Sequence, residues 1–318
     1  MRRFSVACTA LAAALATIAL AMGPAAAAPT PLPVPYSFLP TAAIPGGLSL
    51  GGPPGANDWS CRPSVAHPEP VVLVHGFLGN ASTNWQTYGP LLKNNGYCVY
   101  ALTYGQSAVL PGMAGQLLGG LAPPEQSAVQ VGAFIQRVLT ATGAAKVDIV
   151  GHSEGAIVPD YYAKYLAGAA YIDKYISLAP LWAGTDSQGL GKMYQEVKAL
   201  GLGSLMDALL NPIAGSETGL LAGSDFINAI QSGAGPAVAG IAYTNIVTTH
   251  DELVQPYTSG IAAGMTNYTV QNFCGIDYTE HFEIAADPVA AALVLNALDP
   301  THPRAVPCRL VLPFIGPL

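Results

Sequence analysis

Apolar positions in this chain gather into six short runs separated by longer stretches with helical spacing. The runs are rich in Val, Ile, Leu and Tyr, as expected of strands buried on both faces of a sheet. We expect strands at 71–74, 97–103, 146–150, 175–178, 241–248 and 268–273. Helical patterns predict helices over 85–95, 125–140, 156–166 and 288–298. This alternation predicts an α/β fold with a mostly parallel central sheet flanked by helices.

Two segments interrupt the alternation. The segment 106–124 is rich in Gly and Leu, and the segment 182–237 is long, apolar and punctuated by Gly. Both lie between core elements, where folds of this kind carry caps and lids, so we expect a helical cap or lid insertion at about 182–237. Ordinary packing of peripheral helices is the alternative. The last predicted helix has a clear start, with Asp287 as N-cap and Pro288 at the first helical position.

The N-terminal residues have the features of an export signal. Arg2 and Arg3 precede a short apolar run, Leu11–Met22, and small residues follow at 25–28. We therefore predict a cleaved signal peptide over residues 1–27 and a secreted protein. The apolar run is too short for a membrane span, which needs about 20 residues.

The remainder of the chain divides into an arm and one large domain. Residues 28–58 are crowded with Pro and Gly, which favour neither helix nor sheet, so we expect an extended or mobile arm. The domain covers 59–318, and a chain that is 51% hydrophobic and 10% charged can bury a full core. No segment after the leader is long and apolar enough to predict a transmembrane helix.

Charge and cysteine content limit the partners further. Loss of Arg2 and Arg3 with the leader takes the formal net charge from −7 to −9. Nucleic-acid binding needs clustered Lys and Arg, so we predict no nucleic-acid partner. We also expect the protein to be a monomer. Four cysteines stay in the mature chain, and an even number in an exported protein predicts two disulfides with three possible pairings. We favour Cys61–Cys98 and Cys274–Cys308, because each pair closes a modest loop. A zinc site is the alternative, but no C-x-x-C or His-rich cluster supports a metal.

The motif G-x-S-x-G occurs twice, and its context separates the two copies. Residues 151–155 read Gly-His-Ser-Glu-Gly and lie between a predicted strand and a predicted helix. This is the setting of a nucleophile elbow, a sharp turn that lifts the serine hydroxyl clear of the sheet. The second copy, around Ser49, lies in the arm without either element. Ser153 is therefore the candidate nucleophile.

A serine hydroxyl needs a base, and the base needs an orienting acid. On such a sheet the three residues follow in the order Ser, acid, His. Asp251 follows one strand and His281 the next, and both positions are at carboxyl ends of strands, where open α/β sheets place their sites. We predict the triad Ser153, Asp251 and His281. Glu252 and Asp277 are the alternative acids, and His302 is the alternative base.

The negative oxygen that forms during acyl transfer needs backbone donors. One candidate is the N–H of Glu154, the residue after the nucleophile. The other is the N–H of Phe77, because His75-Gly76-Phe77 follows the strand 71–74 and Gly76 permits a tight turn. Loss of one such donor typically costs about 10²–10³ in rate.

These motifs, in this order, resemble the secreted bacterial lipases of the class 2 type within the α/β-hydrolases. The stretches that carry the resemblance are 72–77 with Trp85, 96–102, 151–155, 178–180, 251–257 and the loop at His281. The resemblance covers about Asp58 to Cys308. It implies a triacylglycerol lipase or esterase that uses the triad above and an oxyanion hole formed by Phe77 and Glu154, without cofactor or metal.

Glu154 departs from the pattern, because similar enzymes carry a neutral residue there, often Gln or Met. A carboxylate that pointed inward would oppose the oxyanion. At a helix N-terminus it would instead point away and be stabilised by the helix dipole.

Three functions are compatible with the sequence. The first is ester hydrolysis, with lipids as substrates. The second is acyl transfer to an alcohol by an exported enzyme on the same scaffold. The third is a lipid-binding surface protein without activity, which a filled triad disfavours.

Overall fold

The computed structural model describes residues 30–39, 51–106, 112–186 and 217–318. The chain divides into two units, Met1–Pro31 and Leu32–Leu318, and the second contains the sheet, the helices and the candidate site. The predicted signal peptide, the motif around Ser49 and the central part of the predicted cap lie outside the described residues.

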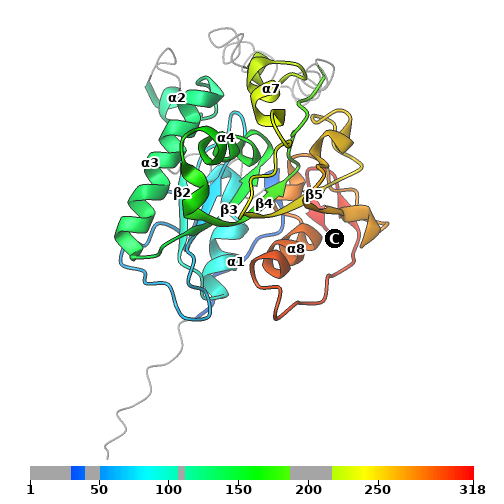
Figure 1. Ribbon diagram of the computed structural model, residues 1–318. Helices are drawn as coiled ribbons and strands as arrows, with labels where there is room; N and C mark the ends of the chain where they lie inside the picture. Colours follow the sequence, from blue (N-terminus) through cyan, green and yellow to red (C-terminus); the bar gives the residue numbers. More distant parts are fainter. Residues whose placement is uncertain (1–29, 40–50, 107–111, 187–216) are drawn as a thin grey trace, which may run out of the picture. The chain divides into compact units, whose positions relative to one another are not determined.

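A six-stranded sheet forms the centre of this unit (Figure 1). All its neighbouring strands are parallel, and their order is β2-β1-β3-β4-β5-β6. The strands are β1 (Val71–Val74), β2 (Val99–Leu102), β3 (Val147–His152), β4 (Ile172–Leu178), β5 (Ala242–Val247) and β6 (Thr266–Thr269). The predicted α/β fold with a parallel sheet is confirmed. A separate antiparallel pair, β7 (Val311–Leu312) and β8 (Gly316–Pro317), follows near the C-terminus.

The bounds of β4 and β6 differ most clearly from the prediction, each for a physical reason. β4 begins at Ile172 rather than at residue 175, because its polar start, Asp173 and Lys174, lies where the strand is only partly buried. β6 is the polar sequence Thr-Asn-Tyr-Thr at the edge of the sheet, where one side is solvated and an apolar run is not needed. The predicted strand over 268–273 overlaps it only at its start, and residues 270–272 form a 3₁₀ turn.

Helices cover both faces of the sheet (Figure 1). They are α1 (Tyr88–Asn94), α2 (Gly112–Leu117), α3 (Pro124–Thr142), α4 (Val158–Tyr165), α7 (Asp225–Gln231) and α8 (Pro288–Leu298). Asp287 caps α8 as predicted, accepting a hydrogen bond from the Ala290 N–H at 2.7 Å. Among the helices in the described ranges, none is both long and apolar enough to cross a bilayer.

Alternate residues of each strand enter two separate cores. In β1, Val72 and Val74 pack with residues of α3 and α4, whereas Val71 and Leu73 pack with residues of α1 and α8. Both cores are apolar, so each strand is buried on two faces. This fixes the carboxyl ends of β1, β3 and β5, from which the candidate site is built.

Two disulfides and the N-terminal arm contact the outer parts of the domain. Cys61 is bonded to Cys98 and Cys274 to Cys308, which is the pairing that we favoured. The described part of the arm lies against the domain: the Thr87 hydroxyl donates to the Pro35 carbonyl at 2.6 Å. It is therefore an extended segment held by hydrogen bonds.

Candidate active site

Ser153 lies in a sharp turn between β3 and the 3₁₀ helix Ser153–Ala156. Its φ of 56° is left-handed, a conformation that costs a non-glycine residue about 1–3 kcal/mol. The turn fits only because Gly155 lacks a side chain, since a Cβ there would overlap the carbonyl oxygens of Val74 and His75. The motif at 151–155 thus has the strand–turn–helix context that was predicted.

Ser153, His281 and Asp251 form a continuous hydrogen-bonded chain. The Ser153 Oγ lies 2.9 Å from His281 Nε2. His281 Nδ1 lies 3.0 Å and 2.9 Å from the two carboxylate oxygens of Asp251. Asp251 and His281 are buried, whereas Ser153 is partly exposed. This arrangement can pass a proton from the serine hydroxyl to an imidazole whose far nitrogen is held by a carboxylate.

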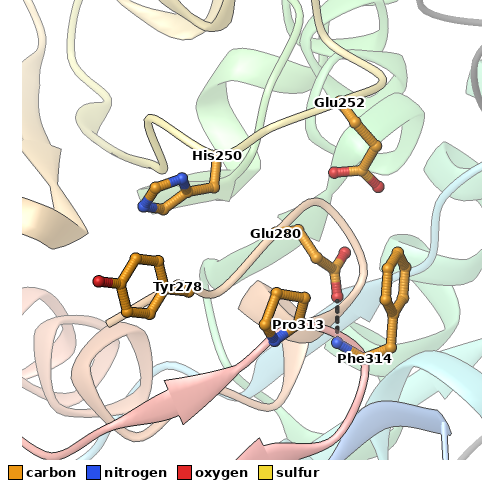
Figure 2. A pocket seen from close by; sticks show the side chains of 6 residues that line it. All are labelled: His250, Glu252, Tyr278, Glu280, Pro313 and Phe314. Carbon is orange, nitrogen blue, oxygen red and sulfur yellow. Dashed lines mark hydrogen bonds between the residues drawn. The ribbon is translucent and has the colours of Figure 1, made fainter. Parts of the chain in front are cut away.

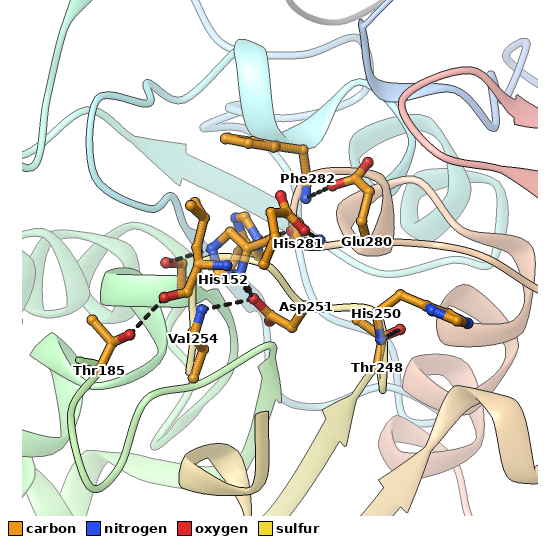
Figure 3. A network of polar contacts seen from close by, with 12 residues as sticks. His152, Thr185, Thr248, His250, Asp251, Val254, Glu280, His281 and Phe282 are labelled. Carbon is orange, nitrogen blue, oxygen red and sulfur yellow. Dashed lines mark hydrogen bonds and ion pairs between the residues drawn. The ribbon is translucent and has the colours of Figure 1, made fainter. Parts of the chain in front are cut away.

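The backbone holds Asp251 in place. One carboxylate oxygen accepts a hydrogen bond from the Leu253 N–H at 3.0 Å. The same oxygen accepts a second one from the Val254 N–H at 2.7 Å (Figure 3). The Thr248 hydroxyl, at the end of β5, donates to the Thr279 carbonyl at 2.7 Å and so joins the acid loop to the histidine loop. The distance between acid and base is therefore fixed by groups outside the pair.

The alternative residues lie elsewhere. The Glu252 carboxylate accepts a hydrogen bond from the backbone N–H of His281 at 3.2 Å, not from its ring. Asp277 accepts from the Thr279 N–H at 2.9 Å. His302 is exposed and pairs with Asp299. None of these three completes the chain to Ser153.

His152 has a positioning role that the sequence interpretation missed. Its Nδ1 accepts from the Asn84 amide at 2.7 Å, so its Nε2–H donates to the His281 carbonyl at 2.8 Å. Burial, together with the nearby His281, lowers the pKa of His152 to about 3, so the ring is neutral. The sequence signal was its place beside Ser153, but its partner is 129 residues away.

Opposing effects set the proton affinity of His281. Burial alone would lower its pKa, but the negative charge and hydrogen bond of Asp251, with a smaller effect of Glu252, raise it above the ordinary value. A raised pKa strengthens the imidazole as a base and stabilises the imidazolium.

The loop after β1 approaches Ser153 closely, and we call its residues 76–79 the oxyanion loop. A Cβ on Gly76 would lie 3.0 Å from the Ser153 Cβ, so a glycine is needed for this contact. The turn closes between the Gly79 N–H and the Gly76 carbonyl (3.0 Å), and Leu78 takes its left-handed conformation. The Phe77 N–H has no hydrogen-bond acceptor among the described residues.

Glu154 does not point away into solvent, as a dipole-stabilised carboxylate would. Its side chain is buried, and burial raises its pKa well above the usual value for a glutamate. Burial thus favours the neutral acid over the carboxylate, and a neutral side chain would not oppose an oxyanion.

An open cavity of about 210 Å³ lies beside the acid and histidine loops (Figure 2). Two of its lining residues, Glu252 and Glu280, adjoin Asp251 and His281 in sequence. Burial, reinforced in Glu252 by the charge of Glu280, raises the pKa of both groups. Ser153 does not line this cavity, so the cavity does not lead to the Ser153 hydroxyl.

The sheet, the elbow and the strand-end loops are those of the α/β-hydrolase class. The family model of the class 2 lipases, "Lipase (class 2)", matches residues 68–293, and the chain belongs to this family.

Known relatives are similar over parts of their length. A triacylglycerol lipase of Pseudarthrobacter phenanthrenivorans is 34% identical over 101 residues, which are 30% of this chain and 28% of that protein. The chain thus spans little more than a quarter of that relative. Aspergillus fumigatus lipase B has a similar fold, with a TM-score of 0.57 and 19% identity over 80% of this chain and 57% of that one. The mature form of Bacillus licheniformis lipase BlEst2 gives a TM-score of 0.53 and 14% identity over 74% and 94%.

Proposed function

We propose that the protein is an exported carboxylic ester hydrolase that acts on lipid esters through an acyl-enzyme intermediate. The observation that carries the proposal is the chain of hydrogen bonds from Ser153 through His281 to Asp251, at the carboxyl edge of a parallel sheet. Membership of the class 2 lipases supports the same reaction class.

Acylation begins when the Ser153 Oγ attacks the acyl carbon while His281 Nε2 takes its proton. The carbonyl oxygen becomes an oxyanion, which accepts hydrogen bonds from the N–H groups of Phe77 and Glu154. The intermediate then collapses: the bond to the alcohol breaks, and His281 gives its proton to that leaving oxygen. Asp251 stabilises the imidazolium throughout.

Deacylation repeats these steps with water. His281 takes a proton from a water molecule as its oxygen attacks the acyl carbon of the ester on Ser153. The proton then returns to the Ser153 oxygen, and the carboxylic acid leaves. No redox change occurs, and atoms and charges balance.

Apolar side chains beside the oxyanion loop support a lipid substrate. Phe77 and Leu78 pack with Leu118 and Leu121 in a small cluster, and all four are within a few residues of the loop or of α2. An ester with an apolar acyl chain would find apolar surface there. The two disulfides favour an oxidising compartment and therefore export.

The test is hydrolysis of p-nitrophenyl esters, together with labelling by a fluorophosphonate probe. Ser153→Ala should abolish labelling and lower kcat by on the order of 10⁶, because the nucleophile is lost. Ser177→Ala, at a buried serine in β4, is the matched control and should still be labelled.

Three results would count against the proposal. Undiminished turnover in Ser153→Ala would remove the nucleophile assignment. A wild-type protein that stays unlabelled would be a binding protein. Product analysis that finds dominant transfer to an added alcohol at low concentration would identify an acyltransferase.

A further inference from the structure

The Glu154 side chain is buried close to the oxyanion loop. It is 1% exposed, and its Oε2 atom has no hydrogen-bond partner among the described residues. No ion pair in the described part of the chain includes it. Burying a charged oxygen without a donor or counter-ion costs several kcal/mol, so this environment favours the neutral acid.

The segment that follows α2 lies next to both Glu154 and the oxyanion loop. Gly120, just after α2, has a φ of +70°, and a Cβ there would lie 2.5 Å from Glu154 Oε2 and 2.9 Å from the Phe77 Cα. The neighbouring Gly119 N–H donates to the Gly79 carbonyl at 2.8 Å. The segment at Gly119 and Gly120 therefore lies against both the Glu154 carboxyl group and the oxyanion loop.

We propose that Glu154 is a positioning residue for the oxyanion loop: its neutral side chain packs against Gly120, which itself lies against Phe77, and so helps to hold the Phe77 N–H toward the substrate oxygen. Ionisation draws water to the carboxylate and loosens the loop. It also places a negative charge on the residue whose own N–H is the second oxyanion donor. Both effects weaken the oxyanion hole. The proposal rests on the proposed function, because it assigns a part in that reaction.

Among the residues that the structure describes, the titratable groups around Glu154 supply no cation. Tyr104, after β2, donates its hydroxyl to the His75 carbonyl at 2.8 Å and stacks on the His75 ring. Burial lowers the pKa of His75 to about 4 and that of His152, at the end of β3, to about 3. Burial raises the pKa of Tyr104 well above its ordinary value, and an ionised Glu154 would raise it further. These groups are neutral at the pH of catalysis, and burial alone sets the direction of the Glu154 shift.

The test compares pH profiles of kcat on a p-nitrophenyl ester from about pH 5 to about pH 10. Wild type should lose about tenfold in kcat for each pH unit above the titration of Glu154. Glu154→Gln and Glu154→Met keep the backbone donor and cannot ionise, so this alkaline limb should disappear or move up by at least about one pH unit in both. Near-ultraviolet circular dichroism at each pH establishes that the proteins are folded.

Glu252→Gln is the matched control, because Glu252 is a second buried glutamate beside the triad, in contact with the His281 backbone rather than with the oxyanion loop. This variant should keep the alkaline limb. Using two neutral variants of Glu154 guards against one that fails to fold.

Several results would overturn the proposal. They are a wild-type profile that stays flat to about pH 10, an unchanged limb in both Glu154 variants, a limb that moves only in Glu252→Gln, or a loss of kcat in the variants that is uniform in pH. Fluorophosphonate labelling of wild type at neutral pH separates the two hypotheses. If Ser153 is not labelled, the proposed hydrolase function is contradicted. If Ser153 is labelled but the alkaline limbs of wild type and of both Glu154 variants coincide, only the role of Glu154 is contradicted.

Discussion

Ser153 and His281 are held by groups from other strand ends, whereas the Asp251 carboxylate is held by the backbone of its own loop. Ser153 keeps a left-handed backbone because glycine at 155 lets β1 approach. His281 is held at its carbonyl by His152 and at its ring by Asp251. In the proposed reaction, an arrangement that is fixed in this way would lose little further entropy.

Asp251→Asn tests the acid at the scale of a single residue. The amide keeps the size of the side chain but cannot hold the ring in the required tautomer, so we expect kcat to fall by roughly 10⁴. The charge of Asp251 raises the pKa of His281, and its removal lowers that pKa. Since His281 must be neutral to accept the proton, the acid limb of kcat/KM should move to lower pH. Steady-state kinetics across the acid range measure both effects.

Glu252→Gln serves as the comparison for this prediction. Glu252 contacts the His281 backbone and not its ring, so its loss should cost less than about tenfold in kcat. A larger loss in Glu252→Gln than in Asp251→Asn would reassign the acid.

At the scale of elements, one lysine fastens the described end of the predicted cap to the core. Lys164, in α4, donates to the carbonyls of Ile230 (2.5 Å), Ser232 (3.0 Å) and Gly235 (2.9 Å), at and after the C-terminal end of α7. A cation at a helix C-terminus also complements the helix dipole. The C-terminal part of the insertion is thus anchored on α4.

Lys164→Met should release this anchor, because it keeps the aliphatic length but removes all three donors. Hydrogen bonds from charged groups contribute about 1.5–3 kcal/mol, so we expect the free energy of unfolding, measured with urea, to fall by that order. Limited proteolysis should cut faster between α7 and β5. Lys146→Met, which removes an ion pair that is about one-third exposed on each side, should change stability by less than about 1 kcal/mol. Equal effects of the two variants would refute the anchor.

The elements that the sequence predicts well are those whose signal is local. β1 and α8 match their predicted bounds, since a buried apolar run and an Asp-Pro start are visible in neighbouring residues. β6 was misplaced because an edge strand can be polar. The elbow was recognisable from its flanking strand and glycines. The contacts of His152 and the burial of Glu154 were not, because their neighbours come from loops far away in the sequence.

At the scale of the whole molecule, the chain buries many carboxyl groups. Those that are buried and have raised pKa values because of burial are Asp148, Glu154, Asp160, Asp277, Glu280, Glu283 and Asp287. Lys174 lies 3.5 Å from Asp148, but for Glu154 and Glu283 no ion pair exists within the described ranges. Their number makes the folded state a stronger proton acceptor than the unfolded chain.

The sign of the resulting pH dependence is set by linkage between protonation and folding. A carboxyl group whose pKa is raised in the folded state contributes stability that is complete below its unfolded pKa of about 4 and is lost as pH rises through the folded value. His75 and His152 act in the opposite sense, because their lowered pKa values add stability as pH rises to about 6.5 and nothing more above it. Above about pH 6.5 the histidines add no further stability, and ionisation of the buried carboxyl groups continues to lower it. The free energy of unfolding should therefore fall from neutral to alkaline pH.

Glu283 offers a single-site test of this behaviour. Its Oε2 accepts a hydrogen bond from the Phe38 N–H at 2.9 Å, and burial raises its pKa to about 8. Glu283→Gln keeps an acceptor for Phe38 and cannot ionise. Between about pH 6.5 and about pH 8, the free energy of unfolding of wild type, measured with urea, should therefore fall by up to about 2 kcal/mol more than that of the variant. Asp225→Asn, which changes an exposed carboxylate, should show the same dependence of the free energy of unfolding on pH as wild type. Parallel curves for wild type and Glu283→Gln would mean that this carboxyl group is already ionised in the folded protein.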